Sequence, residues 1–110
     1  MLTSLCIYRV KRGSEPAFKK LLAKHWPTLK RVGLGADQPS TIYLGKEGED
    51  DAPIFVEILH WKDAEGPGRA HELPDVMAVW EPMGALCEPR AGRPPMEFPV
   101  IERVDVKFEP

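Results

Sequence analysis

The stretch Ile54–Trp61 constrains the fold most, because it is an extended segment with apolar residues on both faces. Alternate residues of a strand point to opposite sides of the sheet. One side carries Phe55, Glu57, Leu59 and Trp61, and the other carries Ile54, Val56, Ile58 and His60. A strand that is apolar on both faces is typical of a sheet covered on both sides. Glu57 must then be protonated or have a partner, because burying an unpaired carboxylate is costly.

The amino-terminal half of the chain predicts a second such strand followed by a helix. Leu2–Lys11 is rich in β-branched and aromatic residues, with Cys6, Tyr8 and Val10 on one face. Ser14 can cap a helix. Its apolar stripe would be Phe18, Leu21, Leu22, His25 and Leu29. We expect Pro27 to bend this helix or to end its regular part near His25, since proline removes a backbone donor.

The second half of the chain predicts two further strands and a second helix. Thr41–Leu44 is a short strand, and an acidic, turn-rich loop leads from it to Ile54. A helix begins irregularly after Trp61, is interrupted before Pro74, and becomes regular from Asp75. Its stripe would be Val76, Val79, Trp80, Met83 and Cys87. Phe98–Phe108 alternates and is predicted to be the last strand, at an edge of the sheet.

This order of elements predicts an α+β fold, the ferredoxin-like β-α-β-β-α-β sandwich, as a single domain over residues 1–110. Both helices would cover the same face of an antiparallel sheet. The other face would then expose the apolar residues of the two inner strands. A large exposed apolar patch usually marks an interface. We therefore expect a homodimer joined through the open sheet face.

Charge and hydropathy exclude several classes of partner. The net charge of −2 gives no basic field for a phosphate backbone, so no nucleic acid partner is expected. The sequence has no run of about 18 apolar residues and no secretory leader, so we expect a cytoplasmic protein with no membrane partner. Cys6 and Cys87 are expected to be reduced, structural thiols.

Several short patterns resemble the dimeric α/β-barrel superfamily, and within it the antibiotic biosynthesis monooxygenase-like domains. They are a first strand that ends in YRVKRG, Phe18 early in the first helix, a third strand that runs into Trp61-Lys62-Asp63, and the pair Ala70-His71 early in the second helix. The resemblance implies a homodimer with a small pocket between the sheet and the helices of each subunit. It also implies chemistry such as cofactor-free oxygenation of aromatic polyketides or haem degradation.

The resemblance further implies which residues would form the pocket. Trp61 is similar to a strand-end tryptophan that lines such pockets, and Phe55, Glu57 and Leu59 would share its side. Cys6 stands where haem-degrading relatives have an asparagine, with Tyr8 beside it. Those relatives have a haem-ligating histidine where this chain has Trp80 and Glu81. This difference argues against haem, and no cofactor is expected.

His71 and Glu57 are the candidate catalytic pair. A carboxylate can fix the tautomer of an imidazole and raise its basicity, and a phenolic substrate deprotonated there could react with oxygen directly. The structural alternative is that His71 braces the broken helix start and that Glu57 has a backbone or arginine partner. A metal site built from His25, His60, His71 and Glu57 is not expected, because His60 and Glu57 point to opposite faces of one strand.

We therefore expect a small homodimeric monooxygenase-like enzyme that acts, without a metal, on a hydrophobic aromatic or quinol-like molecule. His71 would be the base and Glu57 its orienting partner. The predicted substrate-binding residues are Tyr8, Cys6, His25, Trp61 and Trp80. Two alternatives remain open: a ligand-binding or stress-associated module that uses the same pocket without turnover, and a structural dimer with a filled core.

Overall fold

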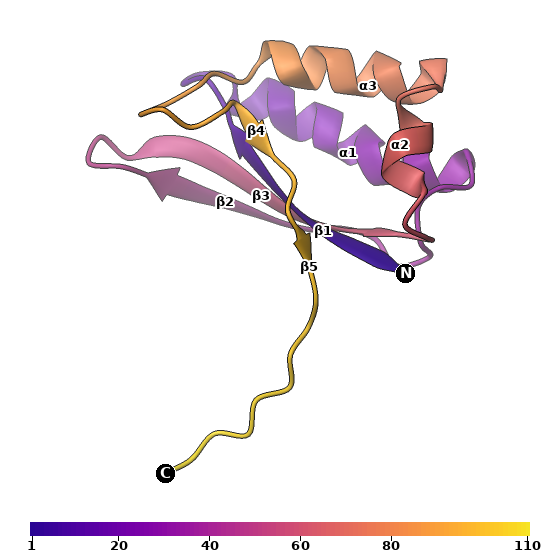
Figure 1. Cartoon of the computed structure of the whole chain (residues 1–110). Coiled ribbons are helices and arrows are strands. Elements are labelled where there is room, and N and C mark those ends of the chain that lie inside the picture. The colour runs from indigo at the N-terminus through magenta and orange to yellow at the C-terminus, as the bar shows by residue number, and fades with distance from the viewer.

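The computed structural model describes residues 1–110 as an antiparallel sheet covered on one face by helices (Figure 1). The elements are β1 (Leu2–Arg9), α1 (Glu15–Arg31), β2 (Thr41–Glu47), β3 (Ala52–Trp61), α2 (Gly66–Ala70), α3 (Pro74–Ala85), β4 (Met96–Glu97) and β5 (Val100–Ile101). The strand order is β2-β3-β1-β4, and β5 also pairs with β1. The predicted α+β, ferredoxin-like class is confirmed.

The pairing of β1 with β3 at the centre of the sheet determines which side chains face the helices. Cys6 lies opposite Glu57, and Tyr8 lies opposite Phe55. Directly opposed residues of an antiparallel pair project to the same face. All four are buried beneath the helices, and Phe18, Leu22 and Leu29 of α1 pack against the same core. The predicted alternation of both strands therefore matches the structure.

Pro27 does not end the regular part of α1 near His25, because the helix runs without interruption from Glu15 to Arg31. That part of the prediction is wrong, and a bend at Pro27 stays a prediction. Pro27 and Ala23, the residue four positions earlier, are both exposed, so solvent can reach the carbonyl that loses its intrahelical donor. Beyond the proline, Thr28 and Leu29 are buried. Burying a leucine side chain contributes roughly 1.5–3 kcal/mol, comparable to the cost of about 3 kcal/mol for an internal proline.

The predicted last strand, Phe98–Phe108, is also wrong in extent. Only Met96–Glu97 and Val100–Ile101 pair with β1, on either side of Pro99. Ile101 already lies opposite Thr3, and β1 begins at Leu2. The chain therefore runs past the end of its partner strand, and residues 102–110 extend away from the body of the molecule (Figure 1).

The sheet face opposite the helices is apolar and incompletely covered. Leu5, Ile7, Val56 and Ile58 are half-buried there, and Tyr43 is exposed.

No helix of this chain is both long and apolar enough to cross a membrane.

Candidate functional site

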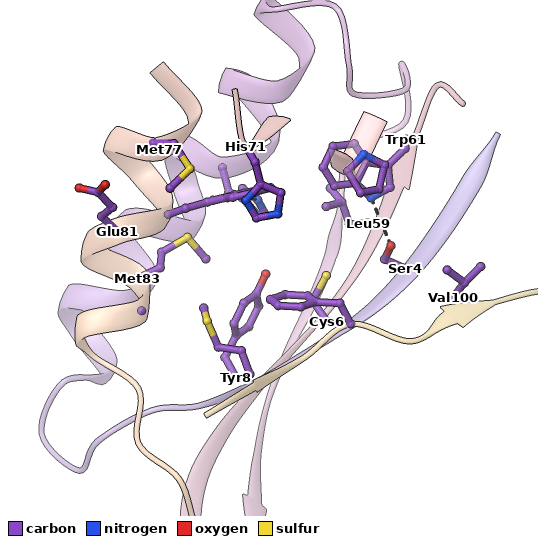
Figure 2. Close-up of a pocket in the computed structure, with 16 residues that line it drawn as sticks. Ser4, Cys6, Tyr8, Leu59, Trp61, His71, Met77, Glu81, Met83 and Val100 are labelled. Atoms are coloured by element: carbon purple, nitrogen blue, oxygen red, sulfur yellow. Dashed lines mark hydrogen bonds between the residues drawn. The ribbon is translucent and has the colours of Figure 1, made fainter. Parts of the chain in front are cut away.

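A cavity of about 480 Å³ lies between the helices and the carboxyl-terminal strands, with β1 and β3 forming its floor (Figure 2). Its lining is mainly apolar and aromatic, and it includes three of the four methionines of the chain. The lining residues are Ser4, Cys6, Tyr8, His25, Leu59, Trp61, Pro67, His71, Met77, Trp80, Glu81, Met83, Gly84, Met96, Phe98 and Val100. Pockets of this size and composition are typical of small-molecule sites.

Glu57 lies in the core below the cavity and is fully buried. The Tyr8 hydroxyl donates a hydrogen bond to Oε1 of Glu57 at 2.7 Å, and Nδ1 of His25 contacts the same oxygen at 2.9 Å. Burial raises the pKa of Glu57, but the hydrogen bond and electrostatic attraction to His25, together with the hydrogen bond from Tyr8, outweigh it and leave the pKa below its usual range. Glu57 is therefore a carboxylate in the folded protein, held by donors from α1 and β1.

Trp80 determines the tautomer of His25. The indole Nε1 of Trp80 lies 2.9 Å from Nε2 of His25, and an indole nitrogen can only donate. Nε2 must therefore accept, which leaves the proton on Nδ1, where it is donated to Glu57. The side chains form one chain of hydrogen bonds, from Trp80 to His25 to Glu57, with Tyr8 bound to the same carboxylate.

Cys6 and Tyr8 lie in the floor of the cavity, and both are held in their protonated forms. Burial, reinforced by the negative charge of Glu57, raises the pKa of the Cys6 thiol to about 12. The same two causes raise the pKa of Tyr8 well above its usual value. Because the thiolate is the nucleophilic form of cysteine, Cys6 is not suited to nucleophilic catalysis.

The predicted pairing of His71 with Glu57 is wrong. His25 is the histidine that binds the carboxylate, and His71 is an exposed residue at the end of α2 whose ring packs edge-on against Trp80, with centroids 4.9 Å apart. The ring of His71 faces the cavity (Figure 2). Its aromatic partner is Trp80, and neither ring nitrogen has a hydrogen bond within the protein.

The structure places six of the seven predicted site residues around the cavity: Cys6, Tyr8, His25, Trp61, His71 and Trp80. Glu57 and Phe55 share the helix-facing side of the sheet, as expected, but they do not line the cavity. The roles of the seven predicted residues in binding or catalysis stay predictions. No group of three or more His, Cys, Asp or Glu side chains is arranged to hold a metal ion.

Sequence reasoning missed much of the remaining lining. Ser4 could have been found by parity, since it is two residues before Cys6 on the same face; it accepts a hydrogen bond from Nε1 of Trp61 at 3.2 Å. Met77 and Gly84 could have been found by their helical spacing from Trp80. Met96, Phe98 and Val100 gave no such signal, because their placement depends on how the carboxyl-terminal segment crosses the cavity.

Comparison with known proteins adds a similarity in fold. No family model and no curated protein matches the chain. An antibiotic biosynthesis monooxygenase is matched at 12% identity over 96% of this chain and 100% of the other, with a TM-score of 0.67. SnoaB, a cofactor-independent oxygenase from Streptomyces nogalater, is matched at 17% identity over 98% of this chain and 97% of SnoaB, with a TM-score of 0.63. Rv0793 from Mycobacterium tuberculosis is matched at 15% identity over 97% and 98% of the two chains, with a TM-score of 0.61.

Proposed function

From its antibiotic biosynthesis monooxygenase-like fold, we propose that this chain is a monooxygenase-like enzyme that acts, without a metal, on a hydrophobic aromatic or quinol-like molecule. The observation that carries the proposal is the cavity, whose apolar and aromatic walls meet one imidazole with no hydrogen bond of its own, that of His71. The similarity to a cofactor-independent oxygenase supports the reaction class.

The walls of the cavity suit a flat apolar ligand. Trp61 and Trp80 stand edge to face, with ring centroids 6.5 Å apart, and methionines lie on the helix and strand sides of the space. Thioethers adapt to irregular ligand shapes and pack well against aromatic rings. A volume of about 480 Å³ accommodates a molecule of two or three fused rings.

His71 is the candidate general base. The ring of His25 has both nitrogens occupied by Glu57 and Trp80, so it cannot accept a proton without losing a hydrogen bond. The ring of His71 carries no such constraint and faces the same cavity. Removing a proton from a phenolic hydroxyl there would make the substrate ring electron-rich enough to react with dioxygen.

Oxygen uptake with hydroxynaphthalene probes, such as 1-naphthol and 1,4-dihydroxynaphthalene, tests this proposal, with the oxygenated product identified by mass spectrometry. Loss of a general base typically costs about 100-fold or more, so we expect His71→Ala to lower kcat/KM at least about tenfold. Glu72→Ala is the matched control, because Glu72 is the exposed neighbour of His71 and does not line the cavity. Turnover that survives unchanged in His71→Ala would remove the proposed role.

A ligand-binding module without turnover is the second candidate, and one observation favours it. No carboxylate or carbonyl orients the His71 ring, whereas general bases are usually held in place by such a partner. In that case the same probes would raise the melting temperature of the protein, while no oxygen is consumed and no product is detected.

A further inference from the structure

The proton of the Tyr8 hydroxyl is committed to Glu57. The distance between the two oxygens is 2.7 Å, and an ionised carboxylate can only accept. Glu57 remains ionised because its pKa lies below the usual range, the effect of burial being outweighed by the hydrogen bond and electrostatic attraction to His25 together with the hydrogen bond from Tyr8. The Tyr8 oxygen is directed into the cavity and therefore presents lone pairs there rather than a proton (Figure 2).

Three of the other donors around the cavity are also committed, whereas His71 at the end of α2 and the Ser4 hydroxyl keep theirs free. Trp80 donates to His25, Trp61 donates to Ser4, and the proton of His25 is donated to Glu57. The Cys6 thiol is hydrogen-bonded to the Tyr8 hydroxyl, but a thiol is only a weak donor, and a phenolic oxygen can also accept from a ligand. The inner part of the cavity thus offers a bound ligand one well-defined acceptor, the Tyr8 oxygen.

We propose that the cavity recognises its ligand through a neutral hydroxyl group that donates a hydrogen bond to the Tyr8 oxygen. The ligand class is an aromatic alcohol, a phenol or a hydroquinol, in preference to the corresponding methyl ether or quinone. This inference rests on the proposed function, since it needs the small-molecule pocket, and it makes Tyr8 a specificity-determining residue of that pocket.

The charge of Glu57 also selects against anions. The carboxylate is fully buried directly behind Tyr8, and no cationic side chain lines the inner cavity. Glu81, at the edge of the cavity, carries a second negative charge and points outward from α3 (Figure 2). A ligand carboxylate next to Tyr8 would be desolvated beside a like charge, which is strongly unfavourable.

Ser4 provides a comparison within the same pocket. Its hydroxyl oxygen accepts from Trp61 at 3.2 Å, so its own proton remains free for an acceptor. Ser4 and Tyr8 lie on one face of β1, four residues or about 13 Å apart along the strand. The two hydroxyls therefore have opposite roles at separate places on the cavity floor.

Binding of three matched probes tests the inference: 2-naphthol, 2-methoxynaphthalene and 2-naphthoate, measured by calorimetry at pH 7.5. We expect 2-naphthol to bind at least about tenfold more tightly than the ether, and 2-naphthoate to bind most weakly, because an unpaired acceptor and a buried like charge are both costly. Tyr8→Phe should remove the preference for naphthol over its ether. Ser4→Ala should retain that preference.

The possible outcomes separate this inference from the proposed function. Equal binding of naphthol and ether by the unaltered protein overturns the inference and leaves the pocket in place. A preference that disappears in Ser4→Ala but persists in Tyr8→Phe assigns recognition to Ser4 and also overturns it. Failure of all three probes to bind contradicts both proposals. If Tyr8→Phe does not fold, the unaltered protein still shows whether naphthol is preferred over its ether, and Ser4→Ala still shows whether that preference depends on Ser4.

Discussion

Glu57 shows how a single buried carboxylate organises the interior of this protein. Desolvation of a carboxylate costs several kcal/mol unless hydrogen bonds replace the lost water. Two donors, from Tyr8 on β1 and His25 on α1, converge on one oxygen of Glu57, and the second oxygen has no partner. The arrangement ties the first helix to the two central strands at the place where the cavity floor begins.

The lowered pKa of Glu57 makes stability depend on pH in a defined direction. A carboxyl group whose pKa is lower in the folded state contributes stability above its ordinary pKa, which is 4.5 for Glu57, and loses it as the pH falls through the folded value. We expect Glu57→Gln to be less stable than the unaltered protein by about 1–3 kcal/mol at pH 7. The variant should lose less further stability below pH 4.5.

Urea unfolding at pH 7, 5, 4 and 3 measures this effect. Glu72→Gln removes an exposed carboxylate and should keep the pH dependence of the unaltered protein. The explanation fails if Glu57→Gln and the unaltered protein lose the same free energy of unfolding between pH 5 and pH 3.

Sequence reasoning at the residue scale identified Glu57 as a group that needs a partner, but it chose the wrong histidine. His25 lies on the apolar stripe of the first helix and His71 at the broken start of the second, and neither pattern tells which helix lies above residue 57 of the sheet. The choice is made by packing: α1 buries His25 directly over β3, whereas α2 ends at the rim and leaves His71 exposed.

At the scale of elements, α2 is held against the end of β3 through a glycine. A Cβ atom at Gly66 would lie 2.6 Å from Cε3 of Trp61, closer than real side chains approach. Trp61 is buried and lines the cavity, so its ring has little freedom to move away. The absence of a side chain at Gly66 thus allows the helix to close one end of the site.

Gly66→Ala should therefore destabilise the protein by about 1–3 kcal/mol, as overpacking does, and should weaken ligand binding because Trp61 must shift. Gly68→Ala is a matched control in the same helix: nothing lies within 4 Å of its Cβ position. Replacing a helical glycine with alanine there should be neutral or stabilising by up to about 1 kcal/mol. Thermal unfolding and tryptophan fluorescence compare the two variants, and equal stability would argue against the close contact.

The sequence predicted the order of the elements but not all of their limits. Apolar periodicity reported the faces of β1, β3 and α1 correctly, because those faces are buried within one chain. The proline rule failed to predict that α1 continues past Pro27, where burial of the following residues outweighs a local helix breaker. Periodicity failed at Phe98–Phe108, where alternation continues after the partner strand has ended. Periodicity shows which face of a segment is apolar, but it does not show what covers that face.

At the scale of the whole molecule, the open sheet face combines apolar residues with one buried ionic group. Arg9 points to this face and is 2% exposed. It binds Glu47 of β2 at 3.0 Å and Glu97 of β4 at 2.6 Å, which links the two outer strands across the sheet. The charges of this face are therefore paired within the chain, and its remaining surface is suited to apolar contact.

The carboxyl-terminal tail, residues 102–110, has an apolar face that nothing in the same chain covers. Val104, Val106 and Phe108 alternate with charged residues and are 74%, 61% and 89% exposed, although this pattern is typical of a strand with one buried face. Within one chain β1 has ended, so no strand is left for the tail to pair with. We predict that a second copy of the chain covers both the tail and the open sheet face, in a symmetric dimer.

Two matched triple variants test this prediction by sedimentation over a range of protein concentrations. Replacing Val104, Val106 and Phe108 with serine should weaken dimerisation at least about tenfold, because each buried apolar side chain contributes roughly 1.5–3 kcal/mol. Replacing the intervening Arg103, Asp105 and Lys107 with serine should change it much less, since exposed charges contribute about 0–1 kcal/mol. Because the tail lies outside the core, both variants should keep the unaltered fold of the protomer. A chain that is monomeric at every concentration, or equal weakening by the two variants, would show that the apolar face of the tail is not a dimer contact.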